Sequence, residues 1–145
     1  VPGCDALSLG AMRYQALATA DFIARHFPDG ITETALRHAP AITFNAKDQL
    51  QIRWARQVTP RRLRLTGHII PSSEAFARAV ELGLGWGMIP DAMSGDARRR
   101  NHLHALIADR PLDVPLYWHV QRAVAPALAP LTAAFRKRAA AELRP

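Results

Sequence analysis

The sequence predicts an α/β protein in which strands and helices alternate along the chain and the strands pair largely in parallel. Short apolar runs of strand type alternate with segments of helical periodicity, and proline or glycine separates most of them. The chain has 145 residues, of which 49% are hydrophobic and 21% are charged. This composition is enough for a sizeable core and excludes a disordered chain.

The chain opens with an expected strand over residues 12–18 and a short helix over residues 20–27. Thr19 stands where it can cap this helix, because a threonine hydroxyl accepts a hydrogen bond from a free backbone N–H. A second short helix begins after Thr32 or Thr34. Both helices are expected to be brief, since proline follows each of them closely.

A compact apolar run at residues 41–45 predicts the next strand, directly after Pro40. Residues 47–58 then predict a helix. Its apolar side chains recur at helical spacing, at Leu50, Trp54 and Val58. Strand and helix together form a βα unit whose junction contains polar residues.

A second βα unit follows, with a strand at residues 67–70 and a helix that Ser72 or Ser73 can cap. Glu74 lies in the first turn of this helix, and Gly83 suits its end. The apolar stripe of the helix consists of Phe76, Ala79, Val80 and Leu84.

The remaining predicted elements are three strands and one long helix. The strands are expected at residues 86–89, 103–107 and 114–120. The helix is expected at residues 127–143, with a core face of Leu128, Leu131, Phe135 and Ala139.

The net charge of +7 raises the possibility of nucleic-acid binding. The basic residues cluster at Arg61, Arg62 and Arg64, at residues 98–100 and at residues 136–138. None of these clusters is interleaved with aromatic residues or carried by a recognition helix. We therefore expect a solvated basic surface rather than a DNA-reading one.

Other bulk features limit the class of protein. No apolar run approaches the ~20 residues of a membrane span, and no signal peptide is recognisable. Cys4 is the single cysteine, which fits a reducing cytoplasm and permits no internal disulfide. The chain starts at a Val-Pro-Gly sequence without methionine, so an amino-terminal portion is expected to be missing.

No catalytic set, cofactor site or metal site is expected. His102 and His104 share a strand face but have no third ligand at a suitable spacing. Ser72 and His68 lack the glycines of a nucleophile elbow, and the serine is better explained as a helix cap. The glycines at residues 83–87 follow a helix and precede a strand, the reverse of a dinucleotide-binding loop.

The sequence does predict a ligand pocket, where strand ends meet helix starts. Hydroxyls and free N–H groups there suit a carboxylate, while Asp48 or Glu74 suits a cationic group. The polar residues at the two junctions are Asn45, Lys47, Asp48, Ser72, Ser73 and Glu74. Taken singly, each is also explained as a cap or a first-turn residue.

Several motifs resemble the effector-binding domain of LysR-type transcriptional regulators, more narrowly the ArgP/LysG (IciA) branch. The Gly-Leu-Gly…Pro segment is general to LysR regulators, whereas Trp-Gly-Met-Ile-Pro and Asp-Val-Pro-Leu-Tyr-Trp are more specific. The matching segments are residues 9–14, 39–51, 71–76, 83–90 and 112–118. The resemblance runs along essentially the whole chain.

The resemblance implies a periplasmic-binding-protein-like (type 2) effector domain, with two α/β subdomains joined by two crossover strands. Residues 12–90 would form the complete second subdomain, and residues 1–11 and 91–145 part of the first. The DNA-binding winged helix-turn-helix has no counterpart in this chain, so DNA would be a partner only through that absent domain. An incomplete first subdomain is expected to expose apolar surface and to leave the pocket without half of its wall.

By the same resemblance, the effector would be a basic amino acid, lysine or arginine, bound in the cleft between the subdomains. Binding would control transcription allosterically, in the cytoplasm, in a homodimer or homotetramer, with amino-acid export genes as targets. The implied effector-binding residues are Asn45, Asp48, Ser72, Ser73 and Glu74, flanked by Met12, Arg13, Pro90 and Asp91. The alternatives are a solute-binding protein of similar fold for amino acids and a small α/β enzyme.

Overall fold

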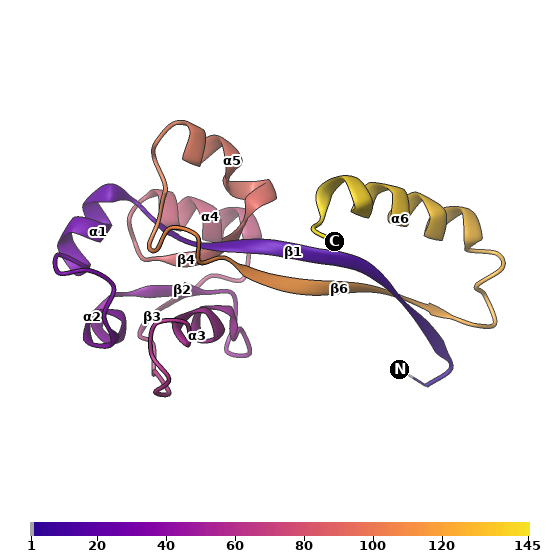
Figure 1. The fold of residues 1–145 in the computed structure, drawn as a ribbon, viewed down its shortest axis with the longest axis horizontal. Helices are drawn as coiled ribbons and strands as arrows, with labels where there is room; N and C mark the ends of the chain where they lie inside the picture. The colour runs from indigo at the N-terminus through magenta and orange to yellow at the C-terminus, as the bar shows by residue number, and fades with distance from the viewer. Residues whose placement is uncertain (1) are drawn as a thin grey trace. The chain divides into compact units, whose positions relative to one another are not determined.

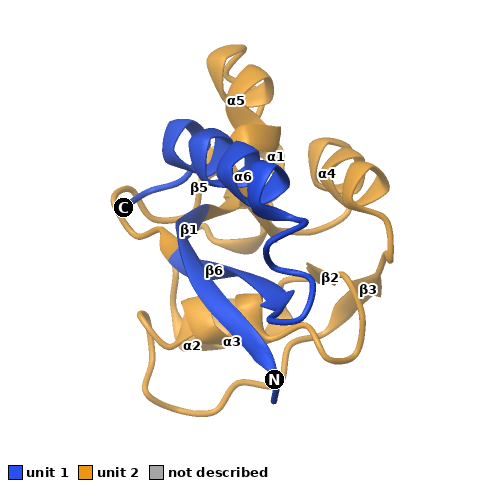
Figure 2. Cartoon of the chain, turned by 90° about the vertical axis from the view of Figure 1, so that its right-hand side faces the viewer, with its two compact units in different colours: residues 1–13, 113–145 blue, residues 14–112 orange. Residues whose placement is uncertain are grey.

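The computed structural model describes residues 2–145, which form two compact units (Figure 2). Unit 1 contains the described residues up to 13 together with residues 113–145, and unit 2 contains residues 14–112. The chain leaves unit 1 within strand β1 (Cys4–Ala18) and returns to it at the start of strand β6 (Leu112–Gln121). By this division residues 91–112 lie in unit 2. The subdomain boundaries expected from the resemblance, at residues 12 and 90, stay a prediction.

Unit 2 is built on strands that run in both directions. The end of β1 pairs antiparallel with β4 (Gly87–Pro90) and with β5 (His104–Ala105). Strand β2 (Ala41–Thr43) pairs in parallel with β3 (Gly67–Ile69), and a parallel bridge from Ala41 to Trp86 connects β2 to the start of β4. The expectation of largely parallel strands thus holds for β2, β3 and β4 and fails for β1, because periodicity does not encode strand direction.

Helices cover both faces of these strands (Figure 1). Helices α1 (Ala20–His26), α2 (Glu33–His38) and α3 (Leu50–Ala55) contribute to one core, and α4 (Ser73–Glu81) and α5 (Asp91–Arg99) contribute to the other. Successive residues of a strand point to opposite faces, so β1 serves both cores. Unit 2 is accordingly a layered α/β structure.

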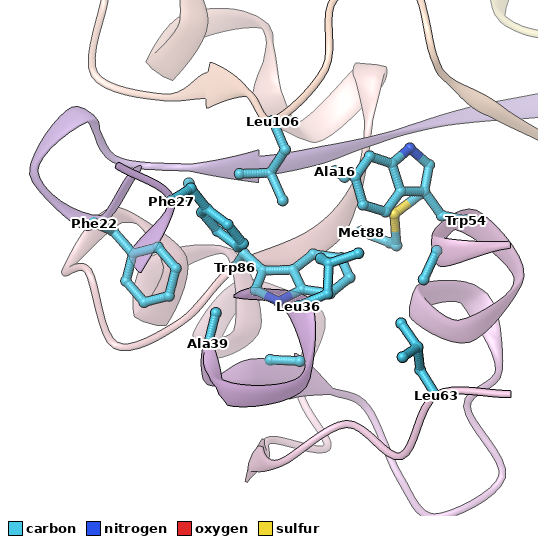
Figure 3. Close-up of a cluster of buried hydrophobic side chains, with 13 residues drawn as sticks. Ala16, Phe22, Phe27, Leu36, Ala39, Trp54, Leu63, Trp86, Met88 and Leu106 are labelled. Carbon is cyan, nitrogen blue, oxygen red and sulfur yellow. The ribbon is translucent and has the colours of Figure 1, made fainter. Parts of the chain in front are cut away.

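The first core is dominated by two tryptophans (Figure 3). Trp54 of α3 and Trp86, which precedes β4, are both fully buried, and their ring centroids lie 5.4 Å apart. Phe22 and Leu36 bring α1 and α2 against them. The second core, on the opposite face, joins α4 and α5 to the strands through Leu17, Ile42, Phe76, Val80, Ile89 and Ala97.

Three helix caps follow the sequence predictions. Thr19 Oγ1 accepts a hydrogen bond from the backbone N–H of Phe22 at 3.3 Å, and Thr32 Oγ1 accepts one from Ala35 at 3.2 Å. Ser72, rather than Ser73, caps α4 by accepting from Ala75 N–H at 3.3 Å. Gly83 ends the same helix with φ of 73°, a backbone conformation that glycine adopts without strain.

Several elements differ from the prediction, and strand β1 begins at Cys4 rather than at residue 12. Helix α3 begins at Leu50, not at residue 47, because residues 44–48 form a hydrogen-bonded loop. Helix α5 was not predicted, since its nine residues are mostly polar; only Ser94 and Ala97 are buried. Arg98 and Arg99 lie in its last turn, where cations are favourable.

Unit 1 consists of the first part of β1, the strand β6 and helix α6 (Ala129–Glu142). β6 pairs with β1, and Ala11 exchanges two backbone hydrogen bonds with Arg144, at 2.8 and 2.9 Å. Trp118 of β6 donates from Nε1 to Thr132 Oγ1 at 3.1 Å and packs on Phe135 with centroids 4.6 Å apart. These contacts attach α6 to the strands.

The predicted core face of the last helix is largely exposed. Ala139 is 8% exposed, but Leu131 and Phe135 are 45% and 41% exposed. Within the described part of unit 1, Trp118 packs on Phe135 but leaves it and Leu131 partly exposed as apolar surface. Over residues 2–145, no helix combines the length and the apolar character required to cross a membrane.

Candidate functional site

A pocket of about 450 Å³ lies in unit 2, where β2 and β4 end and where α4 begins. The bridge between Ala41 and Trp86 aligns these strands in parallel, so their carboxyl ends meet at one edge. This edge is where open α/β sheets bind ligands. The polar residues that line the pocket are Tyr14, Asn45, Lys47, Asp48 and Ser73.

The apolar wall comes from the strand ends and from two helices. Phe44 follows β2, Phe76 comes from the first two turns of α4, and Met93 comes from α5. Met88 and Pro90 belong to β4. Such a mixed lining suits a small solute with an aliphatic portion and a few polar groups.

Tyr14 brings a hydroxyl into this pocket from β1, where its register partner is Pro90 of β4. Burial raises the pKa of Tyr14, and the negative charge of Asp48 raises it further. The phenol is therefore neutral at physiological pH and is able both to donate and to accept a hydrogen bond.

The loop between β2 and α3 is held by its own polar side chains. Asn45 Oδ1 accepts from the Lys47 N–H at 2.8 Å. Asp48 accepts from the Phe44 N–H with Oδ2 at 2.9 Å and from the Leu50 N–H with Oδ1 at 3.0 Å. Local bonds of this kind stabilise turns, and here they shape the wall of the pocket.

The start of α4 contributes the other polar wall. Ser72 caps the helix and Ser73, its first residue, lines the pocket. Backbone N–H groups of a helix's first turn lack intrahelical partners and carry a partial positive charge. A ligand carboxylate is the group that this wall suits best.

Of the predicted site residues, Asn45, Asp48, Ser73 and Pro90 line the pocket. Ser72 is adjacent to it in sequence, and its hydroxyl is engaged in the helix cap. Glu74 lies exposed in the first turn of α4 and is not among the lining residues.

The other three predicted residues are not among the lining residues of this pocket. Asp91 opens α5 and forms an ion pair with Arg98 at 3.4 Å. Met12 and Arg13 belong to unit 1. There Arg13 donates two hydrogen bonds to the Asp113 carboxylate, at 2.7 and 2.6 Å.

Sequence reasoning missed Tyr14 and Met93 as pocket residues. Tyr14 lies two residues after Met12 in a strand, so the alternation of side chains was a signal that both share one face. Met93 had no such signal, because the helix that carries it was not predicted. Among residues 2–145 there is no group of three His, Cys, Asp or Glu residues able to hold a metal ion.

Comparison with known proteins places the chain in a family. Residues 1–140 match the family model of the LysR substrate binding domain. The chain is 45% identical over 123 residues to the HTH-type transcriptional regulator ArgP of Pseudomonas fluorescens (strain Pf0-1), which covers 82% of this chain and 40% of that protein. The chain thus spans about two fifths of the length of this relative.

Two solved structures resemble the chain closely. One contains the C-terminal domains of a LysR family protein from Agrobacterium tumefaciens str. C58, with a TM-score of 0.95 and 42% identity over 99% of this chain and 70% of that one. The other is full-length LysG from Corynebacterium glutamicum with bound effector Arg. Its TM-score is 0.85 and its identity 32%, over 100% of this chain and 49% of that one.

These similarities agree with the periplasmic-binding-protein-like fold expected from the motifs. The relatives carry the names of transcriptional regulators, which disfavours both the solute-binding protein and the small enzyme. Because the family model matches residues 1–140 of the 145, the chain belongs to the LysR substrate-binding domain family, in its ArgP/LysG branch.

Proposed function

We propose that this domain senses a basic amino acid, arginine or lysine, and that the unit 2 pocket forms part of its effector site. The observation that carries the proposal is the meeting of the α4 N-terminus with an apolar wall at the carboxyl ends of β2 and β4. The helix start suits the α-carboxylate, and the apolar wall suits the aliphatic stem of a long side chain. LysG with bound effector Arg, at 32% identity, supports the choice of ligand.

In the intact protein, effector binding is proposed to favour one arrangement of the effector domain and so to alter DNA binding. The DNA contacts belong to a winged helix-turn-helix outside this sequence. Control of amino-acid export genes and a cytoplasmic location are further parts of the proposal, and both rest on the family resemblance.

The intact protein is proposed to act as a homodimer or homotetramer, with residues 73–84 in the interface. The end of this segment exposes Leu82 and Leu84, which are 61% and 50% accessible. A contact between subunits would cover these two leucines, which are otherwise exposed apolar surface.

Calorimetry on the intact protein with L-arginine, L-lysine and L-histidine tests the ligand. Binding of arginine or lysine is expected, and binding of none of the three would refute the proposal.

Glu74→Gln then tests the predicted counter-ion. If Glu74 pairs with the cationic group in a buried site, this change weakens arginine binding by about 1–3 kcal/mol and leaves the uncharged isostere citrulline unaffected. Equal affinities for arginine would remove Glu74 from the site.

A further inference from the structure

We infer that Gln51 is a positioning residue of the effector pocket, and that Asp48 acts with it as a clamp rather than as the counter-ion of the effector. The two side chains hold the loop of residues 44–50 in its binding shape. The inference rests on the proposed function of the pocket and assigns the means by which one of its walls is kept in place.

Gln51 lies in the first turn of α3 and is 1% exposed. Its Nε2 donates to the backbone oxygen of Ile42 at 2.8 Å and to Asp48 Oδ2 at 3.2 Å. Because Ile42 is a fully buried residue of β2, the glutamine connects the loop to the rigid centre of unit 2. Both neighbours of Nε2 are acceptors, which determines the orientation of the amide.

Asp48 extends this connection to both ends of the loop. Its carboxylate accepts from the Phe44 N–H, the Leu50 N–H and Gln51 Nε2. Both oxygens are therefore occupied by donors from the chain itself. A carboxylate used in this way is a poor candidate for pairing with an incoming ammonium or guanidinium group, and a good candidate for fixing the loop.

The clamped loop supplies much of one pocket wall. Five of its residues line the pocket: Phe44, Asn45, Lys47, Asp48 and Leu50. Gln51 itself is not among the lining residues. Any effect of Gln51 on the effector must therefore pass through the loop.

Stability alone does not account for a glutamine at this position. Gln51 Oε1 is buried and has no hydrogen-bond partner among the described residues, so the side chain carries a cost that an apolar residue would avoid. The two bonds of Nε2 are what the glutamine adds. One bond anchors the amide to β2, and the other holds Asp48 in the loop that shapes the pocket.

The test compares Gln51→Leu with Gln49→Leu in the intact protein, using calorimetry with L-arginine. Gln49 is exposed and makes no capping bond, so it is the matched control. We expect Gln51→Leu to weaken arginine binding about tenfold, because a smaller fraction of the molecules has the loop in its binding conformation. Hydrogen exchange of residues 44–50 should be faster in this variant and unchanged in the control.

Asp48→Asn separates a clamp from a counter-ion. If Asp48 acts as a clamp, the substitution weakens the binding of arginine and of its uncharged isostere citrulline by the same factor. If Asp48 is a counter-ion, the substitution weakens the binding of arginine alone. Selective loss of arginine would overturn the inference. Failure of the wild type to bind arginine or lysine would overturn the proposed function and this inference with it. If the wild type binds arginine and Gln51→Leu binds it equally well, the inference about Gln51 is refuted while the proposed function is not.

Gln51→Glu keeps the test decisive if Gln51→Leu does not fold. At pH 8 the introduced carboxylate faces two acceptors, so binding should be weakened. At pH 5.5 burial favours protonation of the introduced group, which then donates to one of the acceptors. Affinity relative to the wild type should recover at pH 5.5, and a pH-independent affinity ratio would contradict the clamp.

Discussion

Replacement of Gly87 by alanine gives a direct test of how α4 packs on β4. A Cβ atom at Gly87 would lie 2.6 and 2.8 Å from two ring carbons of Phe76 and 3.2 Å from Val80 Cγ2. Distances below 3 Å require the neighbours to move. Phe76 is only 7% exposed and Val80 is fully buried, so neither side chain can leave without opening the second core.

Overpacking of this kind costs about 1–3 kcal/mol. For a chain of this size, about 3 °C is lost per kcal/mol, so Gly87→Ala should lower Tm by about 3–9 °C. Thermal unfolding followed by circular dichroism measures the shift. Gly95→Ala is the matched control, because its Cβ would meet only the end of Arg99, at 3.4 Å. In the interior of α5 this control should raise stability by about 0.5–1 kcal/mol.

A double substitution tests whether the clash is the cause. Phe76→Leu removes the ring carbons that the new methyl group would meet. The two changes together should therefore destabilise less than the sum of their separate effects. A Gly87→Ala variant as stable as the wild type, or strictly additive effects, would refute the packing argument.

Two further predictions concern single interactions. Ser72→Ala should lower the free energy of unfolding by about 1 kcal/mol in urea titrations, because α4 loses its cap, whereas Ser73→Ala should leave it unchanged. The hydrogen bond from Arg13 lowers the pKa of Asp113 below its usual value. The carboxylate therefore stabilises the fold above the unfolded-state pKa of about 3.9, and this contribution is lost as pH falls below about 4 through the folded-state pKa. Asp113→Asn should remove that part of the acid dependence below about pH 4. The urea midpoint measured against pH checks this, and the same profile in wild type and variant would contradict it.

Local features were readable from the sequence because they depend on neighbouring residues. The caps by Thr19, Thr32 and Ser72 and the helix end at Gly83 all follow from side chains or backbone freedom within a few positions. The polar junctions at the two strand ends were predicted for the same reason. Motif resemblance added the family.

The sequence did not reveal which junction residues face the pocket. Asn45, Asp48 and Ser73 line it, while Glu74 in the next position does not. On a helix, neighbouring residues point in directions about 100° apart, so the rotation of α4 against β4 decides which of them reaches the ligand. That rotation depends on the packing of Phe76 and Val80 and not on the polar residues.

The sequence by itself determined the α/β character, the position of the strand-to-helix junctions and the family to which the chain belongs. Only the tertiary structure decided the antiparallel direction of β1, the entry of Tyr14 into the pocket and the bond from Gln51 to Ile42. Caps and turns are short-range, so residue types encode them directly. Strand direction and buried hydrogen bonds join distant segments, and their partners become neighbours only when the whole of unit 2 has packed.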